Sequence, residues 1–561
     1  MVDIKKYGIE PFGAVPNERQ LNHYYMGKKA FFHFGVNTFT GLEWGDGTEA
    51  EKLFDPTELD IRQWIRSIKA AGFKLAIITA KHHDGFCLWP SKYNEHSVKN
   101  SPYKNGKGDI IREFTDACHE YGVKVGIYLS PWDRNSEFWG TDEYSEFYAR
   151  QLTELVTEYG KIDEIWWDGA GSTETVYNWG HWAYIIRENQ PDAAIFGALG
   201  AADYVDFRWV GNELGFAGET HYASIDKKYI KVETSRELNK GAAGEASYIP
   251  SETDVSIRPG WFYHKEQDDT VKTVHHLNKI WFESIGRNSM LLLNFPPDRR
   301  GLICDIDVNN AILSHRCISK MLSVNYAAGA QVTASPALMP ELSIDKVTLD
   351  DNDLFYASAE NNCVVDVVLP EKTLINVFTL GELVEAGERI TAFKIEDMSD
   401  GNAELLYSGT SVGVYKAVMI KEKEYTHLRL TITETLAPPV LRTLGLHIFE
   451  DIEDENMLKS KNCDLATLST TKMEYSEDGK SVEINFGGIY PLNEVSFKLV
   501  GSAAFQIDAF DGVRYRTRYR GRTEDGSVCA HIEPAVFESY QIRIKADTEI
   551  HKDVPMSIKF V

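Results

Sequence analysis

The sequence lacks the features that would tie it to a membrane, to nucleic acid or to a cysteine-bound metal. No stretch approaches the run of about 18 apolar residues that a membrane-spanning helix needs. No two cysteines have CxxC spacing. Lys and Arg number only 59 against 84 Asp and Glu, which gives a net charge of −25, whereas phosphate backbones and anionic lipids require clustered positive charge. We therefore expect a neutral ligand, with no nucleic acid and no membrane as partner.

Neither the cysteines nor the N-terminus assigns the chain to a compartment. The seven cysteines are odd in number and widely spaced, which favours free thiols over a disulfide framework. Residues 1–6 lack the apolar core of a secretory signal. Two alternatives are left open: a cytoplasmic protein, or a periplasmic or secreted protein whose leader has been removed. No pattern in the sequence indicates an oligomeric state.

Residues 1–315 alternate between strand-like and helix-like segments, and 561 residues exceed what one ordinary core accommodates. The predicted strands are 30–35, 74–80, 124–129, 162–167, 194–198, 204–210, 246–249 and 289–295. The predicted helices include 61–71, 109–121, 142–159 and 268–285. Eight strands with intervening helices predict an α/β fold of the (β/α)8 TIM-barrel type. Because the helix after the fifth strand looks short or missing, we expect an irregular barrel, with an open doubly wound sheet as the alternative.

The remainder of the chain predicts all-β structure. Residues 363–369 and 428–433 read as strands, the second with clean period-2 alternation. We predict a β-sandwich over 316–450, then an acidic linker at 450–455 and a second small β-sandwich over 456–561. A structural calcium ion in one of these β-domains is left open.

The fourth predicted strand ends in the most informative stretch of the chain. Trp166 and Trp167 are followed by Asp168 and Gly169, which indicates a buried strand delivering a carboxylate into an aromatic pocket. In a barrel, chemistry occurs at the C-terminal ends of the strands. The other predicted strand ends add His33 with Glu43 and Trp44, His82 and His83 with Asp84, Tyr128, Glu213, and Glu252 with Asp254, Arg258 and Trp261.

Glycoside hydrolysis requires such a set, because it uses two carboxylates that flank a sugar, neutral hydrogen-bonding groups and aromatic walls. Metal-dependent hydrolysis is an alternative, with His82, His83 and Asp84 as ligands, although adjacent histidines rarely chelate one ion and no HExxH spacing occurs. A glycan-binding protein without activity is a second alternative. Taken singly, each residue also has a purely structural explanation, since strand-end aspartates cap loops and tryptophans fill cores.

Several of these runs resemble the α-L-fucosidases of glycoside hydrolase family 29. The runs that carry the resemblance are HFGVNTF at 33–39, EWG at 43–45, KHHDGF at 81–86 and WWDG at 166–169. Two more, RWVGNE at 208–213 and SIRPGWFYH at 256–264, are similar to the subfamily that prefers branched α-1,3/1,4-linked fucose. The resemblance covers roughly residues 7–450, and the tail beyond 455 is similar to a discoidin-like sugar-binding module.

The resemblance implies an exo-acting enzyme that releases terminal fucose from branched oligosaccharides by retaining double displacement, with no metal and no cofactor. It makes Asp168 the nucleophile and Glu213 the general acid/base, about 5–5.5 Å apart, and Glu252 is the alternative acid. The residues implied to hold the fucose hydroxyls are His33, Glu43, Trp44, His82, His83 and Tyr128. Trp166 and Trp44 are expected at the methyl group and apolar face of the sugar, and Arg258 and Trp261 on the leaving-group side.

Overall fold

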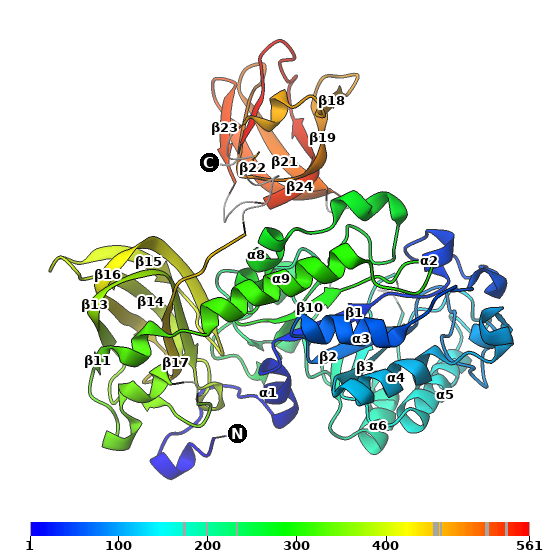
Figure 1. Cartoon of the computed structure of the whole chain (residues 1–561), viewed down its shortest axis with the longest axis horizontal. Coiled ribbons are helices and arrows are strands. Elements are labelled where there is room, and N and C mark those ends of the chain that lie inside the picture. The colour runs from blue at the N-terminus through cyan, green and yellow to red at the C-terminus, as the bar shows by residue number, and fades with distance from the viewer. Residues whose placement is uncertain are drawn as a thin grey trace. The chain divides into compact units, whose positions relative to one another are not determined.

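The computed structural model describes residues 2–171, 175–197, 200–231, 234–349, 351–452, 459, 463–510, 515–532 and 537–559 (Figure 1). The chain forms two compact units. One comprises Met1–Ser256 with Leu277–Glu450, and the other comprises Ile257–His276 with Asp451–Val561. The second unit therefore combines the tail with a short segment from the middle of the chain, a grouping that the sequence does not predict.

Eight parallel strands form a nearly closed barrel in the first unit. The strands are β1 (Lys28–Phe32), β2 (Leu75–Lys81), β3 (Lys124–Leu129), β4 (Glu164–Trp167), β5 (Ala194–Gly197), β6 (Arg208–Trp209), β9 (Ser251–Ser256) and β10 (Met290–Asn294). They are ordered β5-β4-β3-β2-β1-β10-β9-β6. A parallel bridge between Phe196 and Phe207 joins β5 to the residue before β6. The predicted irregular barrel is confirmed, and no helix lies in the described residues 200–207 between β5 and β6.

Helices connect most of the strands, and their ends follow ordinary capping chemistry. They are α1 (Glu18–Tyr24), α2 (Asn37–Thr40), α3 (Ile61–Ala70), α4 (Ile110–Tyr121), α5 (Glu143–Glu158), α6 (Trp179–Asn189), α7 (Ser235–Lys240), α8 (Val274–Glu283) and α9 (Asp305–Leu322). In Figure 1, α3, α4, α5 and α6 follow one another along one side of the strands. Asp109 caps α4 by accepting from the Arg112 N–H, and Gly122 ends that helix at φ 67°. The helix predicted over 268–285 begins only at Val274, because Lys265–Thr270 forms a 3₁₀ turn.

The seventh predicted strand is wrong. Residues 246–249 contribute only β8 (Ser247–Tyr248), which pairs antiparallel with β7 (Ser224–Ile225) outside the barrel. The seventh barrel strand is β9, whose six residues are all buried although most are polar. Glu252 and Asp254 therefore lie within a strand, not in the loop after it. Polar side chains that pair inside a barrel remove the apolar pattern by which a strand is usually recognised.

Arg208 binds the long segment that connects β6 to β9. Its fully buried guanidinium donates to the carbonyl oxygens of Leu238 (3.2 Å), Ala223 (2.9 Å), Tyr222 (2.8 Å) and Ile249. Buried carbonyls need donors, so one side chain satisfies four of them.

A seven-stranded antiparallel sheet completes the first unit. Its strands are β11 (Gln331–Ala334), β12 (Tyr356–Ala357), β13 (Cys363–Glu382), β14 (Ile390–Asp397), β15 (Glu404–Gly409), β16 (Lys416–Thr435) and β17 (Val440–His447). The two predicted strands lie within β13 and β16. Register shifts interrupt the pairing of these 20-residue strands, and a dense apolar core packs against them.

Most of the second unit is also antiparallel. A five-stranded sheet contains β18 (Lys472–Tyr475), β19 (Ser481–Leu492), β21 (Ala503–Phe510), β22 (Tyr515–Thr523) and β24 (Phe537–Ala546). A three-stranded sheet contains β20 (Glu494–Lys498), β23 (Ser527–His531) and β25 (Ser557–Lys559). Both sheets contribute to one apolar core. The predicted linker at 450–455 lies outside the described residues from 453 onward, and the predicted domain boundaries stay predictions.

Two further expectations concern the whole chain. All seven cysteines are free thiols, as predicted. Within the described ranges, none of the helices has both the length and the apolar character that crossing a bilayer demands.

Candidate active site

Asp168 lies directly after β4, at the C-terminal rim of the barrel. Its side chain is 22% exposed. The Tyr128 hydroxyl donates to Oδ2 at 2.9 Å, and the backbone N–H of Ala170 donates to Oδ1 at 2.8 Å. Two donors on different elements therefore fix the orientation of the carboxylate, which is the requirement for a positioned nucleophile.

A hydrogen-bond relay determines which nitrogen of His83 carries the proton. The Ser130 hydroxyl donates its only proton to the Trp132 carbonyl at 2.6 Å. The Ser130 oxygen lies 2.7 Å from Nδ1 of His83, so it accepts from an Nδ1–H. Burial lowers the pKa of His83 to about 4, which keeps the ring neutral. Nε2, which lies 3.6 Å from Asp168 Oδ2, is therefore a hydrogen-bond acceptor.

His33 is held in the same tautomer by Asn294, the last residue of β10. Asn294 Oδ1 lies 2.9 Å from His33 Nδ1 and accepts from the His33 backbone N–H at 3.1 Å. The Asn294 amide donates to Ser256 Oγ at 2.9 Å, which fixes its orientation. Burial lowers the pKa of His33 to about 4, and the Asn294 bond and the charge of Glu43 oppose that shift. Sequence reasoning assigned no role to Asn294 or Ser130, although both stand at the ends of predicted strands.

The aromatic rings of the site form one continuous cluster. The His82 ring centroid lies 4.1 Å from that of His83, 5.5 Å from His33 and 5.7 Å from Tyr128. Tyr128 stacks on Trp166 at 5.4 Å. Burial lowers the pKa of His82 well below its usual value, and the two neighbouring imidazoles add to the effect. Three neutral imidazoles beside aromatic faces suit a neutral, hydroxylated ligand.

Trp44 extends the cluster towards solvent. Its side chain is 49% exposed, and its ring lies nearly perpendicular to those of Trp132 and His83, at centroid distances of 5.6 and 6.0 Å. The loop depends on Gly45, whose φ is +66° and whose missing Cβ would lie 2.8 Å from Asp84. Burial raises the pKa of Asp84 to about 8. Trp44 is therefore an exposed ring on a loop that packs against buried Asp84, and its face is available to stack on a sugar.

Glu213 follows β6, as predicted, and its charge acts on a buried carboxyl of β9. Burial raises the pKa of Asp254 well above its usual value, and the charge of Glu213 adds to that shift. Trp209 Nε1–H donates to Asp254 Oδ1 at 2.8 Å. When two carboxyls are neighbours, one of them keeps its proton to a higher pH, and here that carboxyl is Asp254. The expected distance between Asp168 and Glu213 stays a prediction.

Glu252, the alternative acid, belongs to an ion cluster inside the barrel. Lys29 Nζ lies 2.5 Å from Glu252 Oε2 and 2.7 Å from Glu164 Oε2, and all three side chains are fully buried. Trp166 Nε1–H donates to the other oxygen, Oε1, at 2.9 Å. Burial, followed by the charge of Glu164, raises the pKa of Glu252 to about 7. The raised pKa of Glu252 suits a general acid. Both of its carboxylate oxygens, however, are already hydrogen-bonded to protein groups, Lys29 and Trp166.

Arg258 and Trp261 belong to the second unit. There, Arg258 Nη1 pairs with Asp268 Oδ1 at 2.7 Å, and its guanidinium lies over the Tyr263 ring at 5.0 Å. Their place on the leaving-group side stays a prediction.

Three side chains of the site come close enough together to share a metal ion. His82, His83 and Asp168 offer one ligand atom each within 4.8 Å of one another, whereas Asp84 accepts from Asn37 Nδ2 at 2.9 Å and from the Phe86 N–H at 2.6 Å. The donor set that converges therefore differs from the one that the sequence suggested.

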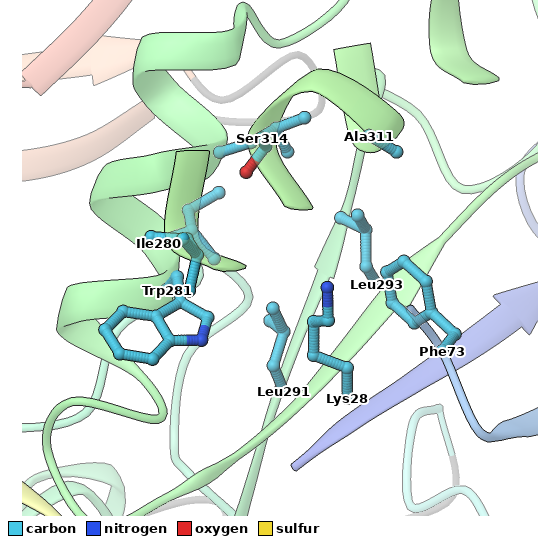
Figure 2. Close-up of a pocket in the computed structure, with 10 residues that line it drawn as sticks. Lys28, Phe73, Ile280, Trp281, Leu291, Leu293, Ala311 and Ser314 are labelled. Atoms are coloured by element: carbon cyan, nitrogen blue, oxygen red, sulfur yellow. The ribbon is translucent and has the colours of Figure 1, made fainter. Parts of the chain in front are cut away.

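Two hollows at the N-terminal end of the barrel do not suit the chemistry. A cavity of about 20 Å³ lies between Lys28, Phe73, Trp281 and Leu293 (Figure 2), and it has room only for water. A neighbouring hollow of about 760 Å³ has one carboxylate, Asp351, among the described residues that line it. Glycoside hydrolysis needs two.

Comparison with known proteins identifies the family. Residues 14–317 match the α-L-fucosidase family. α-L-Fucosidase 1 of Arabidopsis thaliana is 36% identical over 478 residues, which cover 83% of this chain and 92% of the plant protein. A solved GH29 fucosidase of Ruminococcus gnavus in complex with fucose is 29% identical, with a TM-score of 0.72 over 79% of this chain and 96% of that one. A solved glycoside hydrolase 29 family member from an unknown rumen bacterium is 29% identical, with a TM-score of 0.74 over 98% of this chain and all of that one. The chain therefore belongs to the α-L-fucosidases, the glycoside hydrolases of family 29.

Proposed function

We propose that this enzyme is a retaining exo-α-L-fucosidase in which Asp168 is the nucleophile and Glu213 the general acid/base. The observation that carries the proposal is the setting of Asp168. Its carboxylate follows the fourth barrel strand, is oriented by Tyr128 and Ala170, and adjoins neutral imidazoles and aromatic rings.

In the first step an Asp168 oxygen attacks the anomeric carbon while the bond to the leaving oxygen breaks, and Glu213 donates a proton to that oxygen. A covalent fucosyl-enzyme forms. In the second step Glu213 takes a proton from water, the water oxygen attacks the same carbon, and the Asp168 carboxylate is released. The net configuration is retained because the carbon is inverted twice.

The neutral imidazoles of the site explain how fucose is recognised. The Nε2 atoms of His33 and His83 accept hydrogen bonds from sugar hydroxyls without placing a charge beside them. Trp166 and Trp44 provide apolar faces for the methyl group of a 6-deoxy sugar. The similar Ruminococcus gnavus enzyme was solved with fucose bound. The preference for branched α-1,3/1,4 linkages rests on the runs at 208–213 and 256–264.

The nucleophile is tested with Asp168→Ala. We expect turnover to fall by about 10³-fold or more, with partial rescue by azide, a small anion that can attack from the vacated space. The matched control is Asp192→Ala, at an exposed turn, which should leave turnover unchanged. Near-normal turnover of Asp168→Ala on a fucosylated trisaccharide would refute the assignment.

The linkage preference is tested with a panel of α-1,2, α-1,3, α-1,4 and α-1,6 fucosides together with an aryl fucoside. We expect strong cleavage only of branched α-1,3/1,4 substrates and of the aryl fucoside. Good cleavage of the α-1,2 linkage would count against the subfamily.

Metal-dependent hydrolysis is the second candidate, because His82, His83 and Asp168 converge. Activity that survives exhaustive chelation would exclude it. Activity that is lost on chelation and restored by one divalent ion would replace the double-displacement scheme.

A further inference from the structure

We propose that Glu494, Cys529 and His531 form a binding site for a zinc-class divalent ion on the outer face of the three-stranded sheet in the tail. The site is independent of the glycosidase chemistry. It lies wholly within the second compact unit, on β20 and β23.

The sheet register places the three side chains on one face. Glu494 of β20 lies directly opposite His531 of β23, and Ser496 lies opposite Cys529. Along β23, Cys529 and His531 are exposed while Val528 and Ala530 are buried in the core. Because residues two apart on a strand share a face, Cys529 is the diagonal neighbour of Glu494.

The distances approach those of a metal site. His531 Nδ1 lies 3.5 Å from Glu494 Oε2, and His531 Nε2 lies 3.8 Å from Cys529 Sγ. One ligand atom from each residue falls within 4.8 Å of the other two. Ligands of tetrahedral zinc, at 2.0–2.3 Å from the ion, are about 3.3–3.7 Å apart. The His531 side chain is 63% exposed, so it can rotate to direct one nitrogen at the ion.

The donor types select the metal. Thiolate, imidazole and carboxylate are the three ligands that zinc uses in proteins, whereas Mg²⁺ and Ca²⁺ prefer oxygen alone. Three protein ligands on an exposed face leave a fourth position for water. Lys559 of β25 lies opposite Glu494 on the other side. A zinc-class ion that also binds sulfur and nitrogen is favoured here over a cation that meets the carboxylate alone.

Binding would cross-link β20 to β23 and cover the thiol. It should therefore stabilise the tail and protect Cys529 from alkylation, since the thiolate would no longer be available as a nucleophile.

The test uses the untagged full-length protein and Co²⁺ as a spectroscopic probe for the zinc site. We expect one equivalent of Co²⁺ to produce a thiolate-to-cobalt charge-transfer band that Zn²⁺ abolishes. Cys529→Ser should remove the band, and His531→Gln and Glu494→Gln should each weaken binding by about tenfold or more. The controls, Cys463→Ser and His551→Gln, lie elsewhere in the tail and should bind as the wild type does.

The charge-transfer band separates this site from the active site, where the converging residues include no thiol. Absence of the band in the wild type, or its persistence in Cys529→Ser, would overturn the proposal. A second readout is the alkylation rate of Cys529 by mass spectrometry, with Cys463 as the internal reference. Zn²⁺ should slow alkylation of Cys529 about tenfold relative to Cys463, and an unchanged ratio would also overturn the proposal.

Discussion

At the scale of single residues, the hydrogen-bonding character of the site depends on which ring nitrogen of His33 and of His83 carries the proton. Ser130 donates to the Trp132 carbonyl and accepts from His83, and Asn294 accepts from His33. Ser130 and Asn294 are fully buried, and together they make two imidazole nitrogens hydrogen-bond acceptors. A hydroxyl that donates to such a nitrogen is recognised without a charged group, which matches a neutral sugar.

Ser130→Ala tests this relay. The buried Nδ1–H of His83 loses its acceptor, so the ring loses the bond that fixes its tautomer. We expect kcat/KM to fall by about tenfold or more, and Ser130→Thr, which keeps the hydroxyl, to recover most of the loss. Fucoside hydrolysis kinetics measure the effect. A threonine variant as impaired as the alanine variant would point to packing in place of the hydroxyl.

The second residue-scale prediction concerns the general acid of catalysis. Burial and the charge of Glu213 raise the pKa of Asp254 well above its usual value, so the two neighbouring carboxyls hold one proton between them. Asp254→Asn removes one of the two places for that proton, so it should be lost at lower pH. We expect the basic limb of the kcat/KM profile to move down by about one pH unit on a glycan substrate.

An aryl fucoside with a good leaving group is the control for that experiment, because it needs little protonation. Its rate should change less at the basic limb. If the limb stays in place on both substrates, Asp254 does not influence the catalytic acid. If both rates fall equally at every pH, the substitution disturbs structure instead.

At the scale of elements, the apolar strands and the capped helices could be predicted, and the polar strand could not. β3 agrees with the prediction at both ends, since its buried run is bounded by Gly122 and Ser130. β9 was misplaced because Glu252 and Asp254 point to partners inside the barrel. Burial of a charge pair reverses the sequence pattern on which strand prediction depends.

The same distinction holds for the site. The position of Asp168 directly after a buried strand could be predicted, because a local feature, an apolar run that ends in an acid, marks it. Asn294 could not be assigned to His33, because 261 residues separate them and only barrel closure brings β10 beside β1. Roles that depend on pairing between distant strands leave no local signature.

Glu252→Gln tests the ion cluster of β9 through stability. The folded-state pKa of Glu252 is about 7, against about 4.3 for an unfolded glutamate. Between these values the folded state binds a proton that the unfolded state lacks, so the free energy of unfolding falls as pH rises. The variant cannot titrate there. Relative to wild type, its free energy of unfolding should rise by on the order of 2 kcal/mol from about pH 5 to about pH 7.5.

Denaturant unfolding at several pH values measures this difference, with Glu188→Gln, at an exposed helix position, as the control. A difference that stays constant with pH would mean that the proton of the cluster does not reside on Glu252.

At the scale of the whole molecule, the division into units does not follow the order of the chain. Ile257–His276, which connects β9 to α8, groups with the tail, and His275 Nδ1 pairs with Asp451 Oδ2 at 2.5 Å. This connection carries Arg258 and Trp261, which the family resemblance puts on the leaving-group side. The tail therefore belongs to the same compact unit as the connection that carries these two residues.

Removal of the tail after Glu450 tests that coupling. The connection would lose the partner with which it packs, so Arg258 and Trp261 should become less well ordered. We expect kcat/KM for a branched α-1,3/1,4 trisaccharide to fall by about tenfold, a loss of about 1.4 kcal/mol of transition-state stabilisation. An aryl fucoside, whose small leaving group requires few contacts, should lose no more than about threefold. Asp451→Ala in the full-length chain removes the His275 pair while keeping the tail, and it should shift the same ratio in the same direction. Equal losses on both substrates would mean that the truncation damages the barrel, and no loss on either would mean that the connection keeps its conformation without the tail.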